Sequence, residues 1–308
     1  MLEERIKFLI NKLLNIFDLK LVRARTNEPK VFSDITIHPQ SIQYYAGIQP
    51  IVINVDLVNG RTNRWFVLSS DSLDPAIFAI RTSLDEGLLG NDLNQSILSV
   101  LKQHNQMSPC KNVAEKLGLE GESDLLRKYP AWAAVNPWDS QDIKRKFIEY
   151  PQLVKRNRKA HGLVIKTNDP EEIMKIDQEV SLPSHAMQYS SLTENVLKNG
   201  FLYGDSYGYI NAEILVKNDE FRWKPGGEGN HRVAVAAALK KKSIPVIITK
   251  IIDYDDFKFW PNVMSGLFTE RAAQKVFNSI FYAECPRFQE QWINICLNCA
   301  GNNGESTN

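Results

Sequence analysis

The chain has 308 residues, of which 43% are hydrophobic and 24% charged, as in a folded globular protein long enough for two domains. Its 37 basic and 36 acidic side chains leave a net charge of +1, which excludes a strong overall attraction to nucleic acid or an anionic membrane. No apolar segment reaches the roughly 20 residues that span a bilayer, so we expect a cytoplasmic protein with no membrane partner.

The first half of the chain contains secondary-structure signals but no motif that indicates chemistry. An amphipathic helix is expected at residues 2–18. The Asn59-Gly60 pair lies between two alternating apolar runs in residues 51–70, which predicts a β-hairpin. The range 74–118 has helical spacing of apolar residues, with glycine interruptions.

A basic cluster follows in the middle of the chain. We interpret it as a solvated helix face or a connector between domains; the alternative is contact with a phosphate-bearing substrate or with nucleic acid. The cluster consists of Lys155, Arg156, Arg158, Lys159 and His161.

The second half alternates between helix and strand signals, and it ends in a polar tail. Asn218-Asp219 predicts a tight turn between two strands. In chain order we expect a helix or turn at 170–175, a strand at 179–182, a helix ending at Gly200, strands at 210–217 and 220–224, a helix at 231–241, a strand at 244–252 and an amphipathic helix from about Thr269.

Two further groups of residues allow two interpretations each. Cys296 and Cys299 form a C-x-x-C pair with only Cys285 nearby; a structural zinc ion requires four ligands, so buried or terminal thiols are favoured over a metal site. The aromatic residues around Phe259 and Trp260 are typical of a protein core, and the alternative is contact with an adenine ring.

The segment GGEGNHR, residues 226–232, combines glycines, a carboxylate, a histidine and an arginine just before an alanine-rich helix. Glycines permit positive φ and close approach of a ligand, and a helix start presents unpaired N–H groups at its positive end. Arg232 adds a guanidinium fork suited to phosphate, and His231 adds a donor or proton carrier. The alternative is a tight turn in which these two side chains only cap and pack.

These residues also carry a resemblance to a known family. Leu182-Pro183, the helix end KNG at 198–200, a strand ILV, then GEGNHRVAVAAAL and the strand IPV together resemble the ParB/sulfiredoxin domain over roughly residues 170–255. The family includes partition proteins that bind a nucleoside triphosphate, sulfiredoxins that use ATP, and kinases that phosphorylate free serine or related small molecules.

The departures from the family motifs separate its branches. Asn230 stands where sulfiredoxins have their catalytic cysteine, so repair of sulfinic acid is not expected. Partition proteins have a G-x-R-R motif and a following DNA-binding domain, whereas only about fifty residues follow residue 252 here. The serine kinases have acid-G-x-H-R, and the segment Glu228 to Arg232 is similar, with glutamate in place of aspartate.

The resemblance and the needs of phosphoryl transfer together imply a set of roles. Glu228 would hold Mg²⁺ or accept the proton of the acceptor hydroxyl, and His231 would orient the γ-phosphate; these two are the expected catalytic residues. His185, Gln188 and Glu194 are weaker candidates for substrate contacts. The expected nucleotide-binding residues are Gly226, Gly227, Gly229, Asn230 and Arg232.

The sequence therefore predicts an α+β protein with an N-terminal mixed α/β domain at 1–160, a ParB/sulfiredoxin-like domain at 161–284 and a C-terminal segment at 285–308 with a disordered tail. The expected activity is that of an ATP- or ADP-dependent kinase that uses Mg²⁺ and phosphorylates a hydroxyl of a small molecule, such as an amino acid or sugar. The alternative is a non-catalytic nucleotide-binding switch that contacts DNA or a protein partner through the basic cluster; a nucleic-acid partner is not favoured.

Overall fold

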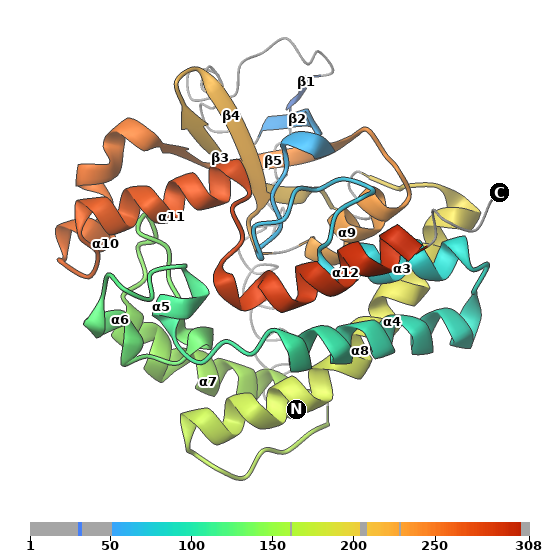
Figure 1. Ribbon diagram of the computed structural model, residues 1–308, viewed down its shortest axis with the longest axis horizontal. Coiled ribbons are helices and arrows are strands. Elements are labelled where there is room, and N and C mark those ends of the chain that lie inside the picture. Colours follow the sequence, from blue (N-terminus) through green and yellow to red (C-terminus); the bar gives the residue numbers. More distant parts are fainter. Residues whose placement is uncertain (1–29, 33–50, 161, 204–207, 228, 303–308) are drawn as a thin grey trace, which may run out of the picture.

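The computed structural model describes residues 30–32, 51–160, 162–203, 208–227 and 229–302. Within them the fold is α+β: helices surround one mixed sheet with the strand order β1-β2-β5-β3-β4 (Figure 1). The helix expected at residues 2–18 lies outside the described residues. The strands are β1 (Lys30–Phe32), β2 (Ile51–Asp56), β3 (Ile210–Lys217), β4 (Glu220–Pro225) and β5 (Ser243–Asp253).

The β3–β4 hairpin is confirmed. Asn218 and Asp219 have φ of 49° and 63°, the left-handed conformation that both central residues of a type I′ turn require, and the two strands pair antiparallel. Strand β5 then pairs parallel with β3, and the connection between them contains α9 (Asn230–Ala238). The return from β4 to β5 therefore holds the glycine-rich segment at the end of the sheet.

The prediction of a hairpin at Asn59-Gly60 is wrong. Strand β2 pairs antiparallel with β5, and residues 57–59 form a short 3-10 turn, η2. Gly60 instead lies against Trp223 of β4, where a Cβ atom would come within 2.8 Å of the indole. Long-range pairing with the apolar β5 strand thus prevails over the local turn preference of Asn-Gly.

The prediction of a strand at residues 179–182 is also wrong. These residues belong to one long helix, α8 (Pro170–Asn199), which continues through Pro183 and ends at Gly200 as expected. Its buried residues Ala186, Tyr189, Thr193 and Val196 recur at helical spacing, and the three apolar ones pack into the main core. This burial outweighs the hydrogen bond that proline removes from a helix interior.

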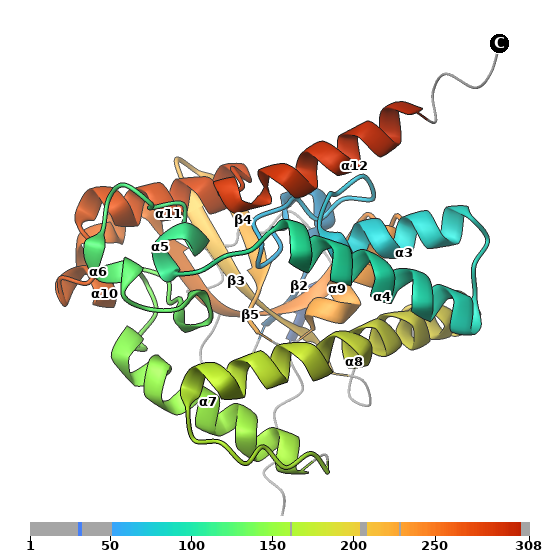
Figure 2. The ribbon, with the colours of Figure 1, turned by 60° about the horizontal axis from the view of Figure 1, so that its bottom comes forward.

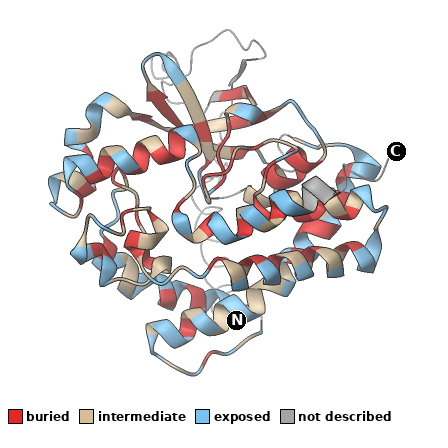
Figure 3. Ribbon diagram, in the orientation of Figure 1, coloured by how far each residue is buried: buried red, intermediate tan, exposed pale blue. Residues whose placement is uncertain are grey.

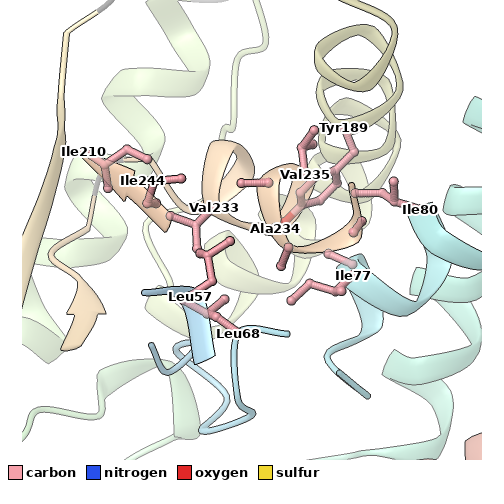
Figure 4. Packing of buried hydrophobic residues seen from close by; sticks show 14 of the residues in the cluster. Leu57, Leu68, Ile77, Ile80, Tyr189, Ile210, Val233, Ala234, Val235 and Ile244 are labelled. Carbon is pink, nitrogen blue, oxygen red and sulfur yellow. The ribbon is translucent and has the colours of Figure 1, made fainter. Parts of the chain in front are cut away.

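Four helices cover one face of the sheet and form the main hydrophobic core with it (Figures 2 and 4). Two helices within the range 74–118, as its apolar spacing predicts, lie there. Helix α9 lies deepest, because all its residues from Val233 to Ala238 are buried. The four helices are α3 (Pro75–Asp85), α4 (Gly90–Met107), α8 and α9.

A second core lies against the opposite side chains of β3: Ile214 points into the main core and Leu215 into the second. Trp260 belongs to this second core and stacks on Phe277 with a centroid distance of 5.7 Å, whereas Phe259 is exposed. The second core is formed with α5 (Val113–Lys116), α6 (Asp124–Arg127), α7 (Ile143–Ala160), α10 (Pro261–Met264), α11 (Glu270–Tyr282) and the short 3-10 helices η3 (Ala131–Ala133) and η4 (Tyr254–Phe259).

The last helix, α12 (Glu290–Asn302), follows η5 (Arg287–Gln289) and buries Trp292 against α3 and α4. Cys296 is buried beside it, and burial raises the pKa of Cys285 to about 12, so Cys285 is a protonated thiol. Among the residues with described side chains, which exclude Cys299, no cluster could hold a metal ion.

Strand β2 comes from the range 1–160 and strands β3 to β5 from the range 161–284, so one sheet joins both predicted domains. Buried residues line the inward sides of the helices on both faces of this sheet (Figure 3). The chain is an α+β protein, and its division into domains at residue 160 stays a prediction.

Candidate functional site

The glycine turn, residues 226–229, connects β4 to α9. Gly226 closes the end of the sheet by donating its N–H to the Asn211 carbonyl at 2.8 Å. Gly227 and Gly229 have φ of 103° and 92°, which side chains other than glycine rarely adopt. Glu228 lies outside the described residues, so its roles as proton acceptor and Mg²⁺ ligand stay predictions.

The two positive-φ glycines differ in their surroundings. A Cβ atom at Gly229 would meet the side chain of Ile210 at 2.9 Å, whereas one at Gly227 would meet nothing within 4 Å. Gly229 therefore lets the chain pack against β3, and the exposed backbone of Gly227 is open to a ligand. This is the arrangement that close approach of a phosphate requires.

Helix α9 begins at Asn230 with Gly229 as its N-cap residue, and its first helical hydrogen bond is donated by Val233 to the Gly229 carbonyl at 3.0 Å. The N–H groups of the first turn therefore have no acceptor within the helix. The Asn230 side chain braces the turn: its Nδ2 donates to the Gly227 carbonyl at 2.8 Å, and its Oδ1 accepts from Asn63 at 3.1 Å.

Arg232 also has a bracing role that the sequence did not indicate. Its Nη1 donates to the Gly208 carbonyl at 2.8 Å, just before β3. Tyr203 is near enough for the charge of Arg232 to act on it; burial is nevertheless the larger effect and raises the pKa of Tyr203 to about 12. The predicted phosphate contact of Arg232 would have to be made from this position at the side of the helix.

Three rings converge on the start of α9. His231 lies in the first turn of α9, and its ring centroid is 5.2 Å from that of His185 and 4.6 Å from that of Tyr189. His185 and Tyr189 are one helical turn apart on α8, and Figure 4 shows Tyr189 directed toward α9. The structure thus brings together two predicted site residues, and it adds Tyr189.

The electrostatic surroundings keep both imidazoles neutral. Burial, and then the neighbouring His185, lower the pKa of His231 to about 4. Loss of solvent also lowers the pKa of His185, and the charges of Arg64 and Arg158 act in the same direction. At neutral pH each ring can therefore accept a hydrogen bond or a proton.

An ion pair not recognised from the sequence lies close to these rings. Asp74 is 3% exposed, caps the start of α3 and pairs with Arg64 at 3.4 Å. Burial is the main cause that raises the pKa of Tyr189; the charge of Asp74 adds to it and that of Arg64 opposes it. Tyr189 therefore stays a neutral phenol, able to donate a hydrogen bond at the site.

The other two predicted substrate residues, Glu194 and Gln188, are not part of this cluster of rings. Glu194 accepts a hydrogen bond from the backbone N–H of Gly90 at the start of α4, about 13 Å along α8 from His185. Gln188 is exposed on α8, and its side chain makes no hydrogen bond to another described residue.

Comparison of the chain with protein-family models, with curated proteins and with solved structures found no match. The ParB/sulfiredoxin resemblance therefore depends on the residues quoted for it and stays a prediction. In the described parts of the chain, no helix is both long and apolar enough to cross a membrane.

Proposed function

We propose that this protein is a nucleotide-dependent kinase with a ParB/sulfiredoxin-like site at the start of α9. It would transfer a phosphoryl group from ATP or ADP, with Mg²⁺, to a hydroxyl of a small molecule such as an amino acid or sugar. The observation that supports this most is the convergence of His231, His185 and Tyr189 beside a glycine turn with exposed backbone.

The phosphates would bind to backbone groups rather than to a lysine. The backbone of Gly227 is exposed and open to a phosphate, Gly226 and Gly229 would shape the turn around it, and the start of α9 carries the positive end of the helix dipole. Asn230 would contribute its backbone N–H, because its side chain braces the turn. Arg232 would add charge from the side of the helix.

In the transfer step, the acceptor oxygen forms a bond to the terminal phosphorus as the bond from that phosphorus to the bridging oxygen breaks. The shortened nucleotide leaves with the bridging oxygen, and the acceptor proton passes to a base. Glu228 is the base that the resemblance implies, and a neutral His231 or His185 has the protonation state for the same role. Mg²⁺ would neutralise the developing charge, and where a histidine is the base, Glu228 would be its protein ligand.

The test is product formation from ATP and from ADP with pools of amino acids and sugars, measured by mass spectrometry. We expect a phosphorylated product that requires Mg²⁺, and we expect His231→Gln to lower kcat by about 10² to 10⁴ while nucleotide affinity changes little. No product from any pool would contradict the proposed kinase, and an undiminished rate in a folded His231→Gln protein would remove His231 from the transfer step.

The pH dependence gives a second test of the same residue. Because the folded-state pKa of His231 is lowered to about 4, its ring remains neutral on acidification well below the ordinary value of 6.5. If neutral His231 is required, the acid limb of kcat/KM should have an apparent pKa near 4 and not near 6.5. A limb near 6.5 would remove His231 from the catalytic step.

One observation, on the surface of α7, supports the alternative function, a nucleotide-binding switch. An open groove of about 860 Å³ there is lined by Ile148, Leu153, Arg156 and Lys159, which would suit a protein partner. Contact with DNA has less support, since Arg158 is paired with Asp177 of α8 at 2.6 Å. Nucleotide binding without turnover would favour the switch over the kinase.

A further inference from the structure

A cavity of about 240 Å³ lies on the second-core side of the sheet, separate from the glycine turn. Three lysines from distant parts of the chain line it: Lys116 of α5, Lys146 of α7 and Lys224 of β4. We refer to it as the lysine cavity. Nothing in the spacing of these lysines along the sequence indicates that they meet.

Only one of the three ammonium groups forms an ion pair with a carboxylate in the part of the chain that the structure describes. Lys224 pairs with Glu213 of the neighbouring strand at 2.8 Å. Lys146 donates to the backbone carbonyl of Ala134, and Lys116 lies 5.4 Å from the ring centroid of Phe288. No described carboxylate forms an ion pair with Lys116 or Lys146.

The lysines are close enough to repel one another. Burial lowers the pKa of Lys116, and the charges of Arg64 and Lys146 lower it further. Burial also lowers the pKa of Lys146, with Lys224 acting in the same direction and Asp139 against it. Such a concentration of cations costs stability in the empty protein, and an anion placed among them would remove that cost.

A strained turn forms the wall of the lysine cavity nearest the glycine turn. Trp65 is almost fully buried in the second core although its φ is 72°, a conformation that a bulky side chain rarely adopts. The Thr62 hydroxyl stabilises this turn by accepting the N–H groups of Arg64 and Phe66 at 3.1 and 3.3 Å. The same turn places Asn63 at the cavity, where its amide also donates to Asn230 of α9.

The size of the cavity limits what it can hold. Its volume corresponds to about eight water molecules and is below the roughly 300 Å³ at which drug-sized ligand sites begin. A second asparagine, Asn136, also lines it, so amide groups are present beside the ammonium groups. These dimensions and donors suit a small molecule with one or two oxyanion groups.

We infer that the lysine cavity is a binding site for a small oxyanion, a phosphate or carboxylate group, held by the ammonium groups of Lys116 and Lys146. This site goes beyond the proposed kinase function and does not depend on it, because no described residue of the glycine turn or of α9 lines the cavity. The hydrogen bond from Asn63 to Asn230 connects the two sites, so occupation of one can affect the other.

The test uses inorganic phosphate and malonate as probes, titrated into the full chain by calorimetry. We expect saturable binding of at least one probe, and a loss of affinity of about tenfold to a hundredfold in Lys146→Met and in Lys116→Met. The matched control is Lys144→Met, because Lys144 is exposed on the same helix, two residues from Lys146. The control should bind like the unmodified chain.

A second measurement does not require any variant to fold. Saturating phosphate or malonate should slow acetylation of Lys146 and Lys116, measured by peptide mass spectrometry, and should leave that of Lys144 unchanged. Absence of binding by the unmodified chain, unchanged affinity in both folded lysine variants, or equal acetylation rates with and without the probes would each overturn the inference.

Competition with ATP identifies the source of the oxyanion. If ATP displaces phosphate and Lys146→Met weakens ATP binding too, the cavity holds the phosphates of the nucleotide. If ATP and phosphate bind together, the cavity holds the acidic group of a separate small molecule. Phosphate binding that depends on the lysines, in a protein that neither binds nor consumes nucleotide, would support this site while contradicting the proposed function.

Discussion

Gly229 is the residue at which the sheet, the glycine turn and α9 meet. Its φ of 92° excludes most side chains on conformational grounds, and the close contact with Ile210 excludes even a methyl group on steric grounds. Ile210 is fully buried in the main core and cannot move away without leaving a void. The phosphate-binding geometry proposed for the turn thus depends on the packing of β3.

We therefore expect Gly229→Ala to lower the free energy of unfolding by about 1 to 3 kcal/mol, because it adds backbone strain and a steric contact. Urea denaturation of both proteins measures the change. Gly121→Ala is the matched control: a Cβ atom there meets nothing within 4 Å, so its effect should be within about 0.5 kcal/mol. Equal stability of the Gly229→Ala and unmodified proteins would show that the turn can rearrange.

How far the candidate site could be predicted also depends on single residues. The glycine turn and His231 were recognisable because their residue types cluster within seven positions. Tyr189 has no such signal while residues 179–182 are expected to form a strand; on a helix, its spacing of four from His185 places both on one face. Lys116, Lys146 and Lys224 meet only through tertiary packing, which no local pattern reports.

At the scale of elements, a turn signal in the sequence predicts the local structure correctly where no distant strand competes for pairing with the same segment. Asn218-Asp219 specified a hairpin because β3 and β4 are neighbours both in sequence and in the sheet. Asn59-Gly60 carried an equally strong signal, but β2 gains more by pairing with β5 inside the sheet. The same competition explains α8, where packing against the main core keeps Pro183 within a continuous helix.

The contact of α4 with η5 and α12 includes a buried histidine that titrates. His104 is 5% exposed, its Nε2 is 3.0 Å from the Gln289 Oε1, and its ring lies edge-on to Trp292 at 5.3 Å. Burial is the first cause that lowers its pKa to about 4, followed by the charge of Arg64. Between pH 4 and pH 6.5 the ring is therefore neutral in the folded protein. In the unfolded chain, where the pKa of this histidine is near 6.5, the ring is protonated over the same range.

Because the unfolded state binds more protons between pH 4 and pH 6.5, the free energy of unfolding should fall as the pH is lowered through this range. The contribution of His104 is on the order of 2 kcal/mol. His104→Gln should be less stable at pH 7, where it loses ring packing, but its stability should depend less on pH. Urea unfolding at pH 7, 5.5 and 4.5 measures how the free energy of unfolding changes with pH in the unmodified protein and in His104→Gln. His231 contributes equally to both proteins, so an equal pH dependence of the two would contradict this account.

At the scale of the whole molecule, the sheet connects the two candidate sites. Strand β4 carries Lys224 on the second-core side and continues into the glycine turn, and the buried helix α9 packs against α3 and α8 in the main core. A ligand bound at the start of α9 or in the lysine cavity therefore contacts elements that come from both halves of the chain. Ligand binding should accordingly stabilise the fold as a unit rather than one local segment.

We therefore expect nucleotide with Mg²⁺ to raise the melting temperature of the whole chain. A ligand that binds only the folded state contributes about 2.7 kcal/mol at a hundredfold excess over its Kd, which corresponds to about 4 °C for a chain of this length. Differential scanning fluorimetry with ATP, ADP, CTP and GTP measures the shift. Arg232→Ala should reduce the shift, because it removes a cation beside the proposed phosphate site and releases the Gly208 carbonyl. Lys144→Met should leave the shift intact, and a chain that responds to none of the four nucleotides would contradict the proposed nucleotide site at α9.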